Sequence, residues 1–309
     1  MYKKRFPIVV LIPTHGRPKL LSRTLDSLAT CDLPASYHEL IVIENGSRAG
    51  AENVVASLPD RLNARYMHRE RGNKSYALNE ALETIPDGLI VFFDDDVRVL
   101  REILMHYASA AAQKGEKNFF GGPIDVDYES PSPEWLTPYL PGSARGWGLN
   151  GIEVESHPWF LGANWATFAE EIRNVGGFDT SVGPGEAAVG QETEIQQRLV
   201  AHGCVKVFVP GAKVWHYVPK ERCSPKWALQ RQYRHAVTDG LQNTEGDRLW
   251  GVPRWIPREM MRSTYMAVRD LLRGQRYDAF DSVANLYRYA GLAYGVRCAP
   301  KVVLVVRLS

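Results

Sequence analysis

The first hundred residues alternate apolar runs with segments of helical spacing. Apolar side chains are nearly continuous at 7–12, 39–44 and 89–93, as in strands that are buried on both faces of a sheet. Helical spacing is found at 17–30, 50–58 and 73–85, and a short strand signal lies at 64–68. Such alternation predicts an α/β fold with a parallel sheet and right-handed crossovers.

The middle of the chain has a different pattern. Residues 123–160 contain six prolines and three tryptophans, which excludes regular helix and is too aromatic for a flexible linker. We interpret this stretch as an ordered insertion over the sheet. Further helices are expected at 169–175, 192–202, 226–241, 258–273 and 279–295, with strand-like segments at 205–209 and 213–216.

A domain boundary is predicted near residue 222. Pro219 and Pro225 bracket a charged turn there, and the pattern beyond it is helical. We therefore expect an N-terminal α/β domain at 1–222 and a helical C-terminal region at 223–309.

Composition narrows the class of protein. The chain has 309 residues, of which 45% are hydrophobic and 23% charged, as in ordinary globular proteins. These values argue against wholesale disorder, collagen and coiled coil. The formal net charge of +2 and the lack of a recognisable nucleic-acid-binding module predict no nucleic-acid partner.

The cysteines and apolar runs bear on localisation. Cys31, Cys204, Cys223 and Cys298 lie far apart without a CxxC pair, which predicts reduced thiols in a cytoplasmic protein. The first apolar run, of about six residues, is too short for a signal peptide, and no stretch approaches the ~18 apolar residues of a spanning helix. The basic, aromatic C-terminal helices leave two alternatives open, a solvated face or peripheral association with the inner face of the membrane. Homo-oligomerisation also stays open.

Polar clusters follow three of the predicted strands. The segments Thr14–Arg17, Glu44–Ser47 and Asp94–Asp96 each come directly after an apolar run. Ligands of open parallel sheets bind outside the carboxyl ends of the strands, so these segments are expected to converge on one crevice. Three adjacent carboxylates would repel one another, and Mn²⁺ or Mg²⁺ is the natural cation to neutralise them. A solvated acidic turn is the alternative.

Common phosphate-binding motifs are absent from the sequence. There is neither a G-x-x-x-x-G-K-[ST] loop nor a G-x-G-x-x-G turn after the first strand. Thr14, Arg17 and the basic stretch 69–74 remain as candidates for contacts with a nucleotide or phosphate.

Six segments, in order, resemble motifs of the inverting family-2 glycosyltransferases: VVLIPTHGRP, IVIENGS, VFFDDDV, GGFD, GQETEIQQRL and VWH. The resemblance covers roughly residues 7–220. It implies the GT-A fold, a Rossmann-like, mostly parallel sheet flanked by helices. It also implies metal-dependent sugar transfer from a nucleotide donor, most commonly a UDP-sugar, to a hydroxyl of a glycan or lipid-linked saccharide.

The resemblance implies donor-binding roles for seven positions. The nucleotide would be held in the first strand-end loop and against Glu44, the ribose by Asp94, and the donor sugar by Asp95 and the pair at 164–165. The seven positions are Thr14, Arg17, Glu44, Asp94, Asp95, Asn164 and Trp165.

By the same resemblance, Asp96 would be the metal ligand, His216 would complete the metal or diphosphate site, and Glu192 would be the catalytic base. Inverting transfer needs a base that takes the proton of the acceptor hydroxyl, and a metal can stabilise the leaving nucleoside diphosphate. A glutamate in the first turn of a helix suits this role, because negative charge is favourable there. Glu194 is the nearby alternative.

Three departures from the family pattern stand out. The run Ala77-Leu78-Asn79 lacks an expected arginine, and glutamates at 44 and 192 replace aspartates. The segment Gly176–Asp179 is predicted to be an architectural turn anchored by Phe178.

Two other functions stay open. One is a catalytically inert partner subunit that binds nucleotide sugars. The other is a sugar nucleotidyltransferase, which the missing glycine-rich triphosphate loop disfavours.

Overall fold

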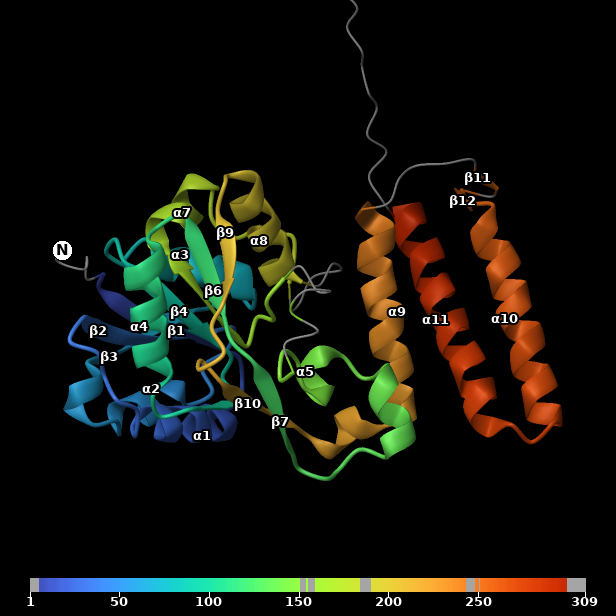
Figure 1. Cartoon of the computed structure of the whole chain (residues 1–309), viewed down its shortest axis with the longest axis horizontal. Helices are drawn as coiled ribbons and strands as arrows, with labels where there is room; N and C mark the ends of the chain where they lie inside the picture. Colours follow the sequence, from blue (N-terminus) through green and yellow to red (C-terminus); the bar gives the residue numbers. More distant parts are fainter. Residues whose placement is uncertain are drawn as a thin grey trace, which may run out of the picture. The chain divides into compact units, whose positions relative to one another are not determined.

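The apolar runs of the N-terminal part form the centre of a seven-stranded sheet in the computed structural model, which describes residues 6–150, 154, 159–183, 190–242, 248–249 and 251–298. The strand order is β3-β2-β1-β4-β8-β6-β9 (Figure 1). The strands are β1 (Ile8–Thr14), β2 (Tyr37–Asn45), β3 (Ala64–Arg69), β4 (Leu89–Phe93), β6 (Asn118–Gly121), β8 (Asn164–Phe168) and β9 (Val205–Phe208).

The sheet is mostly parallel. Strands β1 to β4 pair in parallel, as do β6 and β9, whereas β8 runs antiparallel to both β4 and β6. The predicted α/β fold with a mostly parallel central sheet is therefore confirmed.

Helices cover both faces of this sheet because successive strand residues point to opposite sides. In β1, Ile8, Val10 and Ile12 pack with α1 (Pro18–Leu28), α2 (Ala51–Ala56) and α4 (Ile103–Lys114). Val9 and Leu11 pack with α3 (Lys74–Leu82), α7 (Ala169–Asn174) and α8 (Gln191–Ala201) on the other side. The continuous apolar pattern of the strand thus serves two cores.

A second sheet has three strands in the order β5-β10-β7, and β5 is the strand that follows β4 in the sequence. It consists of β5 (Val97–Val99), β7 (Ile124–Tyr128) and β10 (Val214–Val218). Strand β10 pairs antiparallel with β5 and parallel with β7. This small sheet brings residues near 216 next to the residues that follow β4.

The chain divides into two units, and the division falls between Lys220 and Glu221. The described part of the first unit covers 6–131, 141–150, 154, 159–183 and 190–220, and Ser132–Leu140 belongs to the second unit. The division lies beside the boundary predicted at 222.

The expectation of a single insertion at 123–160 is wrong. Its first residues form β7, whereas the 3₁₀ helix η2 (Glu134–Tyr139) belongs to the second unit, where Trp135 packs against Tyr277 and Phe280. The helix α5 (Gly142–Arg145) returns to the first unit. The tryptophans of this stretch therefore pack in two different cores. Elsewhere in the chain, η1 (Asp60–Leu62) and η3 (Lys220–Cys223) are two further 3₁₀ helices.

Three long helices dominate the second unit. They are α9 (Pro225–Gln242), α10 (Trp255–Leu272) and α11 (Arg276–Cys298), with a short hairpin of β11 (Arg248–Leu249) and β12 (Val252–Pro253). Figure 1 shows α11 between the other two. Gly291 and Gly295 of α11 permit close packing on α9, since an added Cβ would lie 2.3 Å from the Tyr233 carbonyl oxygen and 2.1 Å from that of Val237.

Among the described residues, none of the helices combines the length and the apolar character needed to cross a bilayer. All four cysteines are unbridged.

A glycine turn after α7 anchors the edge of one core. Gly176 and Gly177 both have left-handed backbone angles, with φ of +85° and +77°. The turn delivers Phe178 against Phe92 and Trp165, and the Asn79 side-chain amide bonds both the backbone N–H and the carbonyl of Phe178. The segment is architectural, as the sequence predicted.

The two glycines provide a matched test of this turn. Gly176→Ala should cost about 1–2 kcal/mol of unfolding free energy, because it adds only left-handed backbone strain and its Cβ meets nothing within 4 Å. Gly177→Ala should cost roughly 1–2 kcal/mol more, since its Cβ would lie 2.7 Å from the Asn79 Oδ1 atom. Urea unfolding followed by tryptophan fluorescence measures both losses, and equal losses would contradict the role of Asn79.

Candidate active site

The acidic triplet Asp94–Asp96 follows β4 and meets the end of the neighbouring strand β1. The Thr14 hydroxyl donates a hydrogen bond to Asp95 Oδ2 at 2.6 Å. Arg17 donates from Nη1 to Asp96 Oδ2 at 2.8 Å and from Nη2 to Asp95 Oδ1. Because β1 and β4 pair in parallel, their carboxyl ends lie at the same edge of the sheet. The predicted convergence of these two strand ends is thus present.

Burial and the arginine set the charge state of the triplet. Burial raises the pKa of Asp95 to about 6, although the charge of Arg17 and the hydrogen bond from Thr14 oppose the shift. Desolvation lowers the pKa of Arg17, but the charges of the three aspartates outweigh it and raise the pKa above its usual value. Arg17 is therefore a permanent cation at this position.

Asp96 and His216 share a buried corner. The backbone N–H of Tyr217 donates to the Asp96 carbonyl at 2.8 Å, which fixes β10 beside the triplet. His216 Nε2 lies 3.4 Å from Asp96 Oδ1. Among the described residues, neither Asp96 Oδ1 nor His216 Nδ1 makes a hydrogen bond, although both atoms are buried. A carboxylate and an imidazole with unsatisfied buried atoms are a donor set that fits a divalent cation.

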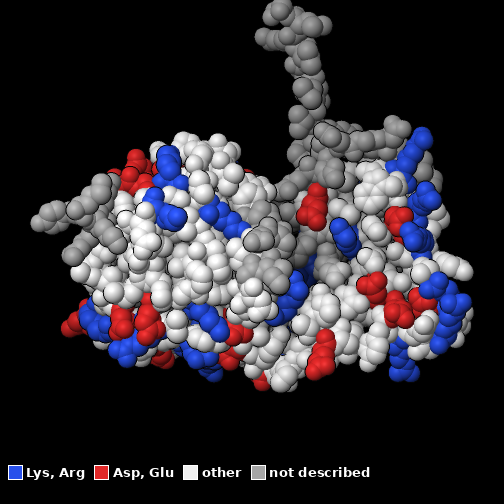
Figure 2. Space-filling model, in the orientation of Figure 1, with Lys and Arg blue, Asp and Glu red and all other residues white. Residues whose placement is uncertain are grey.

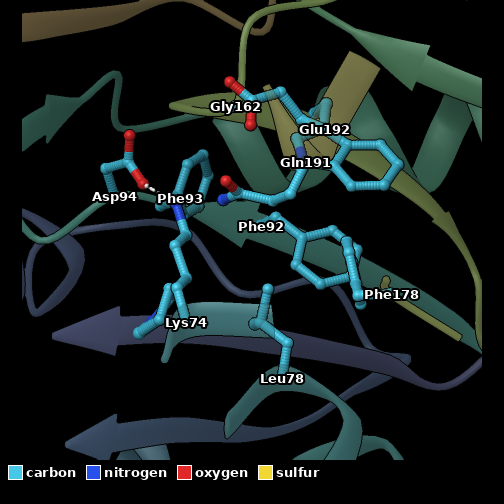
Figure 3. Close-up of a pocket in the computed structure, with 11 residues that line it drawn as sticks. Lys74, Leu78, Phe92, Phe93, Asp94, Gly162, Phe178, Gln191 and Glu192 are labelled. Atoms are coloured by element: carbon cyan, nitrogen blue, oxygen red, sulfur yellow. Dashed lines mark hydrogen bonds and ion pairs between the residues drawn. The ribbon is translucent and has the colours of Figure 1, made fainter. Parts of the chain in front are cut away.

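A small pocket opens beside Asp94 (Figure 3). Its lining combines an apolar floor with charged side chains at the rim. The lining residues are Pro13, Lys74, Leu78, Phe92, Phe93, Asp94, Gly162, Trp165, Phe178, Gln191 and Glu192.

Lys74 and Asp94 form the charged rim on one side of the pocket. The Lys74 Nζ atom donates to Asp94 Oδ1 at 2.6 Å (Figure 3). Desolvation raises the pKa of Asp94, but the charge and hydrogen bond of Lys74 outweigh it and hold the pKa below its usual value. The pKa of Lys74 is raised, because Asp94 and Glu192 together outweigh its desolvation. Lys74 is thus a cation held between two carboxylates.

Glu192 enters the pocket from the first turn of α8. Gly162 lies opposite, and a Cβ there would come within 2.9 Å of the Glu192 carboxyl carbon. Glycine at 162 therefore leaves the space that the carboxylate occupies. The alternative base Glu194 is bound to Arg198, with Oε2 2.6 Å from Nη2. Of the two glutamates, only Glu192 lines the pocket.

Three predicted donor-binding residues are placed differently from the rest. Trp165 lines the pocket floor but is almost fully buried, stacked on Phe92 with 4.5 Å between ring centroids. Asn164 is buried on the other face of β8, where it accepts from the Tyr107 hydroxyl at 2.7 Å and donates to the Ala212 carbonyl at 2.7 Å. The polar atoms of the Asn164 side chain are therefore engaged in holding the fold together, and its role toward the donor stays a prediction.

Glu44 is also turned away from the pocket. Its carboxylate is buried and accepts hydrogen bonds from the Ala49 backbone N–H at 2.8 Å and the Tyr66 hydroxyl at 2.6 Å. It orders the loop after β2, and the expectation that this side chain faces the base stays a prediction.

The pairing of Lys74 with Asp94 was missed by the sequence reasoning, which left Lys74 within the basic stretch 69–74. A signal was available, because Asn73 precedes it at a strand-to-helix junction. The Asn73 side chain accepts from the Tyr76 N–H at 2.8 Å and caps α3, which places Lys74 in the first turn at the edge of the pocket.

Comparisons with known proteins show the family and the fold that this chain resembles. The family model described as glycosyl transferase family 2 matches residues 9–166. The succinoglycan biosynthesis protein ExoM of Rhizobium meliloti is 26% identical over 235 residues, which are 74% of this chain and 72% of ExoM. Validoxylamine A glucosyltransferase of Streptomyces hygroscopicus subsp. jinggangensis is 28% identical over 63% of this chain and 51% of its own length.

Among solved structures, the mannosyltransferase PcManGT from Pyrobaculum calidifontis, in complex with GDP-Man and Mn²⁺, shares the fold. Its TM-score is 0.56 at 19% identity, with 94% of this chain and 74% of that chain covered.

Thr14 offers a test of the charge balance in the triplet. Thr14→Val should lower the unfolding free energy by about 1.5–3 kcal/mol, because the Asp95 carboxylate loses a donor. The loss should be largest above pH 6, where Asp95 is ionised, and should shrink as the pH falls through about 6 and the carboxyl becomes protonated. Urea unfolding across this pH range measures the loss. Thr14→Ser, which keeps the hydroxyl, should behave like the wild type, and a pH-independent loss would contradict this assignment.

Proposed function

The chain belongs to glycosyl transferase family 2, and on this premise we propose that it transfers a sugar from a UDP-sugar, with inversion at the anomeric carbon, to a hydroxyl of a glycan or lipid-linked saccharide. The proposed reaction requires Mn²⁺ or Mg²⁺. One observation carries the proposal: Glu192 and the Lys74–Asp94 pair face one pocket at the strand end where Asp96 and His216 present unsatisfied atoms.

Asp96 and His216 are the residues that would hold the cation. Asp96 Oδ2 is engaged by Arg17, which leaves Oδ1 facing the imidazole. Within the part of the chain that the structure describes, no cluster of three or more histidine, cysteine or carboxylate groups is placed to bind a metal. The donor diphosphate and water would therefore complete the coordination. When bound, the cation would stabilise the negative charge of the leaving diphosphate.

Two solved structures of similar fold support the choice of cation and donor class. PcManGT is in complex with GDP-Man and Mn²⁺, and GalNAc-T7, with a TM-score of 0.54 at 15% identity over 79% of this chain and 53% of that chain, is in complex with UDP, GalNAc and Mn²⁺. We propose UDP as the nucleotide of the donor, and a GDP-sugar is the alternative. Comparing the activity of the protein with UDP-sugars and with GDP-sugars distinguishes the two.

Glu192 would act as the general base. Its carboxylate projects from the first turn of α8 into the pocket, where negative charge is favourable. It would accept the proton of the acceptor hydroxyl as the hydroxyl oxygen attacks the anomeric carbon. Lys74 and Arg17 would hold the negatively charged side of the donor, since both cations lie beside the triplet.

The two glutamates of α8 separate base catalysis from general damage to the helix. Glu192→Gln should lower kcat by about 10²–10⁴-fold with little change in donor affinity, because only the proton acceptor is lost. Glu194→Gln, two residues away, should retain most of the activity. Nucleoside diphosphate release with candidate acceptors measures kcat, and calorimetry with UDP measures binding. A wild-type protein that binds UDP but transfers nothing would instead be the inert partner subunit.

Metal removal is the second test. EDTA should abolish nucleoside diphosphate release across a panel of UDP-, GDP- and dTDP-sugars, and added Mn²⁺ should restore it.

Asp96→Asn should weaken Mn²⁺ binding by roughly tenfold or more, because a charged ligand is lost. Electron paramagnetic resonance in the presence of UDP measures this binding. Asp87→Asn, at an exposed carboxylate paired with Arg173, is the control. Activity that survives EDTA would refute the metal role. Pyrophosphate release from UTP and a sugar 1-phosphate would indicate the nucleotidyltransferase instead.

A further inference from the structure

One face of α10 presents large apolar side chains to solvent. Met261, Tyr265, Val268 and Leu272 recur at i, i+4, i+7 and i+11, and their exposed fractions lie between 53% and 83%. At 3.6 residues per turn these positions form a single stripe about 16 Å long. The buried side chains of α10, which include Ile256, Ser263, Ala267 and Asp270, lie on the opposite face. We refer to the four exposed residues as the α10 stripe.

Such a stripe differs from ordinary surface apolar residues. Single exposed hydrophobic side chains are common on soluble proteins and need no explanation. Four at helical spacing on one face make a continuous apolar band, and bands of this kind mark contact surfaces. The helix therefore has two apolar faces, one satisfied by the second unit's own core and one that no described residue covers.

Arginines follow one edge of the α10 stripe. Arg258, Arg262, Arg269 and Arg273 recur at i, i+4, i+11 and i+15, adjacent to the stripe on the helix surface. Figure 2 shows basic side chains gathered over α10.

Two of these four arginines pair with the acidic residues of α10, whereas the described residues show no ion pair for Arg258 and Arg273. Asp270 is buried and pairs with Arg269 at 2.7 Å, and Glu259 lies 3.7 Å from Arg262 on the inward-turning side. The outward half of the helix is therefore apolar and cationic.

We propose that this face of α10 docks on the surface of an anionic lipid bilayer. The α10 stripe would enter the boundary between headgroups and acyl chains, and the arginines beside it would contact lipid phosphates. A second copy of the same face is a poorer fit, because it would offer the arginines no acidic side chain. The proposal rests on the second unit alone and does not depend on the proposed glycosyltransferase reaction.

The experiment measures binding of the full-length protein to vesicles of phosphatidylcholine and to vesicles in which part of that lipid is replaced by phosphatidylglycerol. The wild type should bind the anionic vesicles at least about tenfold more tightly, and added salt should weaken this binding. Replacing Met261, Tyr265 and Leu272 together by Gln should reduce binding by about tenfold or more, because the inserted apolar area is lost. Replacing Arg258 and Arg262 by Gln should reduce it by roughly thirtyfold on anionic vesicles.

Matched changes in the first unit serve as controls. Met105 and Val200 are each 45% exposed on other helices, so Met105→Gln with Val200→Gln removes exposed apolar side chains outside α10. Arg101→Gln with Lys114→Gln removes two exposed cations. Both control variants should bind like the wild type, and circular dichroism checks the helix content of every variant.

Three outcomes would overturn the proposal. The first is a wild type that ignores anionic vesicles. The second is vesicle binding that survives both sets of changes in α10, since the contact would then be made elsewhere on the chain. The third is a concentration-dependent dimer, seen by analytical ultracentrifugation, that the stripe changes dissociate while vesicle binding is absent; this face would then join two copies.

Discussion

Three carboxylates in a row at the end of a buried strand can remain charged only if the rest of the chain supplies partners for them. Lys74 of α3 pairs with Asp94, and Thr14 donates to Asp95. Arg17 is shared by Asp95 and Asp96, and His216 lies beside Asp96. Segments that are up to 202 residues apart in sequence, from Thr14 to His216, are thereby held at one edge of the sheet. The pocket, the corner formed by Asp96 and His216, and the first turn of α8 all lie around this neutralised triplet. An unpaired buried carboxylate would destabilise the fold by far more free energy than any one of these contacts contributes.

The central strands and most helices could be predicted from the sequence because their apolar patterns are long and have a single period. The strands β6 and β8 were not predicted, because they are paired antiparallel by residues far apart in sequence and the local sequence carries no sign of that pairing. The stretch at 123–160 misled for a different reason. Its aromatic residues are equally compatible with one core or with two, and the tertiary partners of Trp135, which lie more than 140 residues further along the chain, decide between them.

The site was predictable to the extent that topology controls it. Parallel strands place their carboxyl ends together, so the meeting of Thr14, Arg17 and the aspartates follows from strand order alone. Asn164 and Glu44 depend instead on which way a side chain turns. Asn164 alternates with Trp165 along β8 and so faces Tyr107, and Glu44 reaches its own loop because a backbone N–H and a tyrosine hydroxyl are at hand. The Lys74–Asp94 pair was missed because a metal was expected to balance all three charges, whereas a side chain balances one of them.

The close contact between α9 and α11 has a mechanical consequence. At Gly240, Gly291 and Gly295 one helix touches the backbone of the other directly, and any side chain at these positions would collide with a carbonyl oxygen. Sliding α11 along α9 by one turn toward its C-terminal end would bring Tyr287, four residues before Gly291, into a gap that admits only hydrogen, so this contact disfavours such a slide. We therefore expect α9 and α11 to move as one rigid body in any conformational change of the second unit.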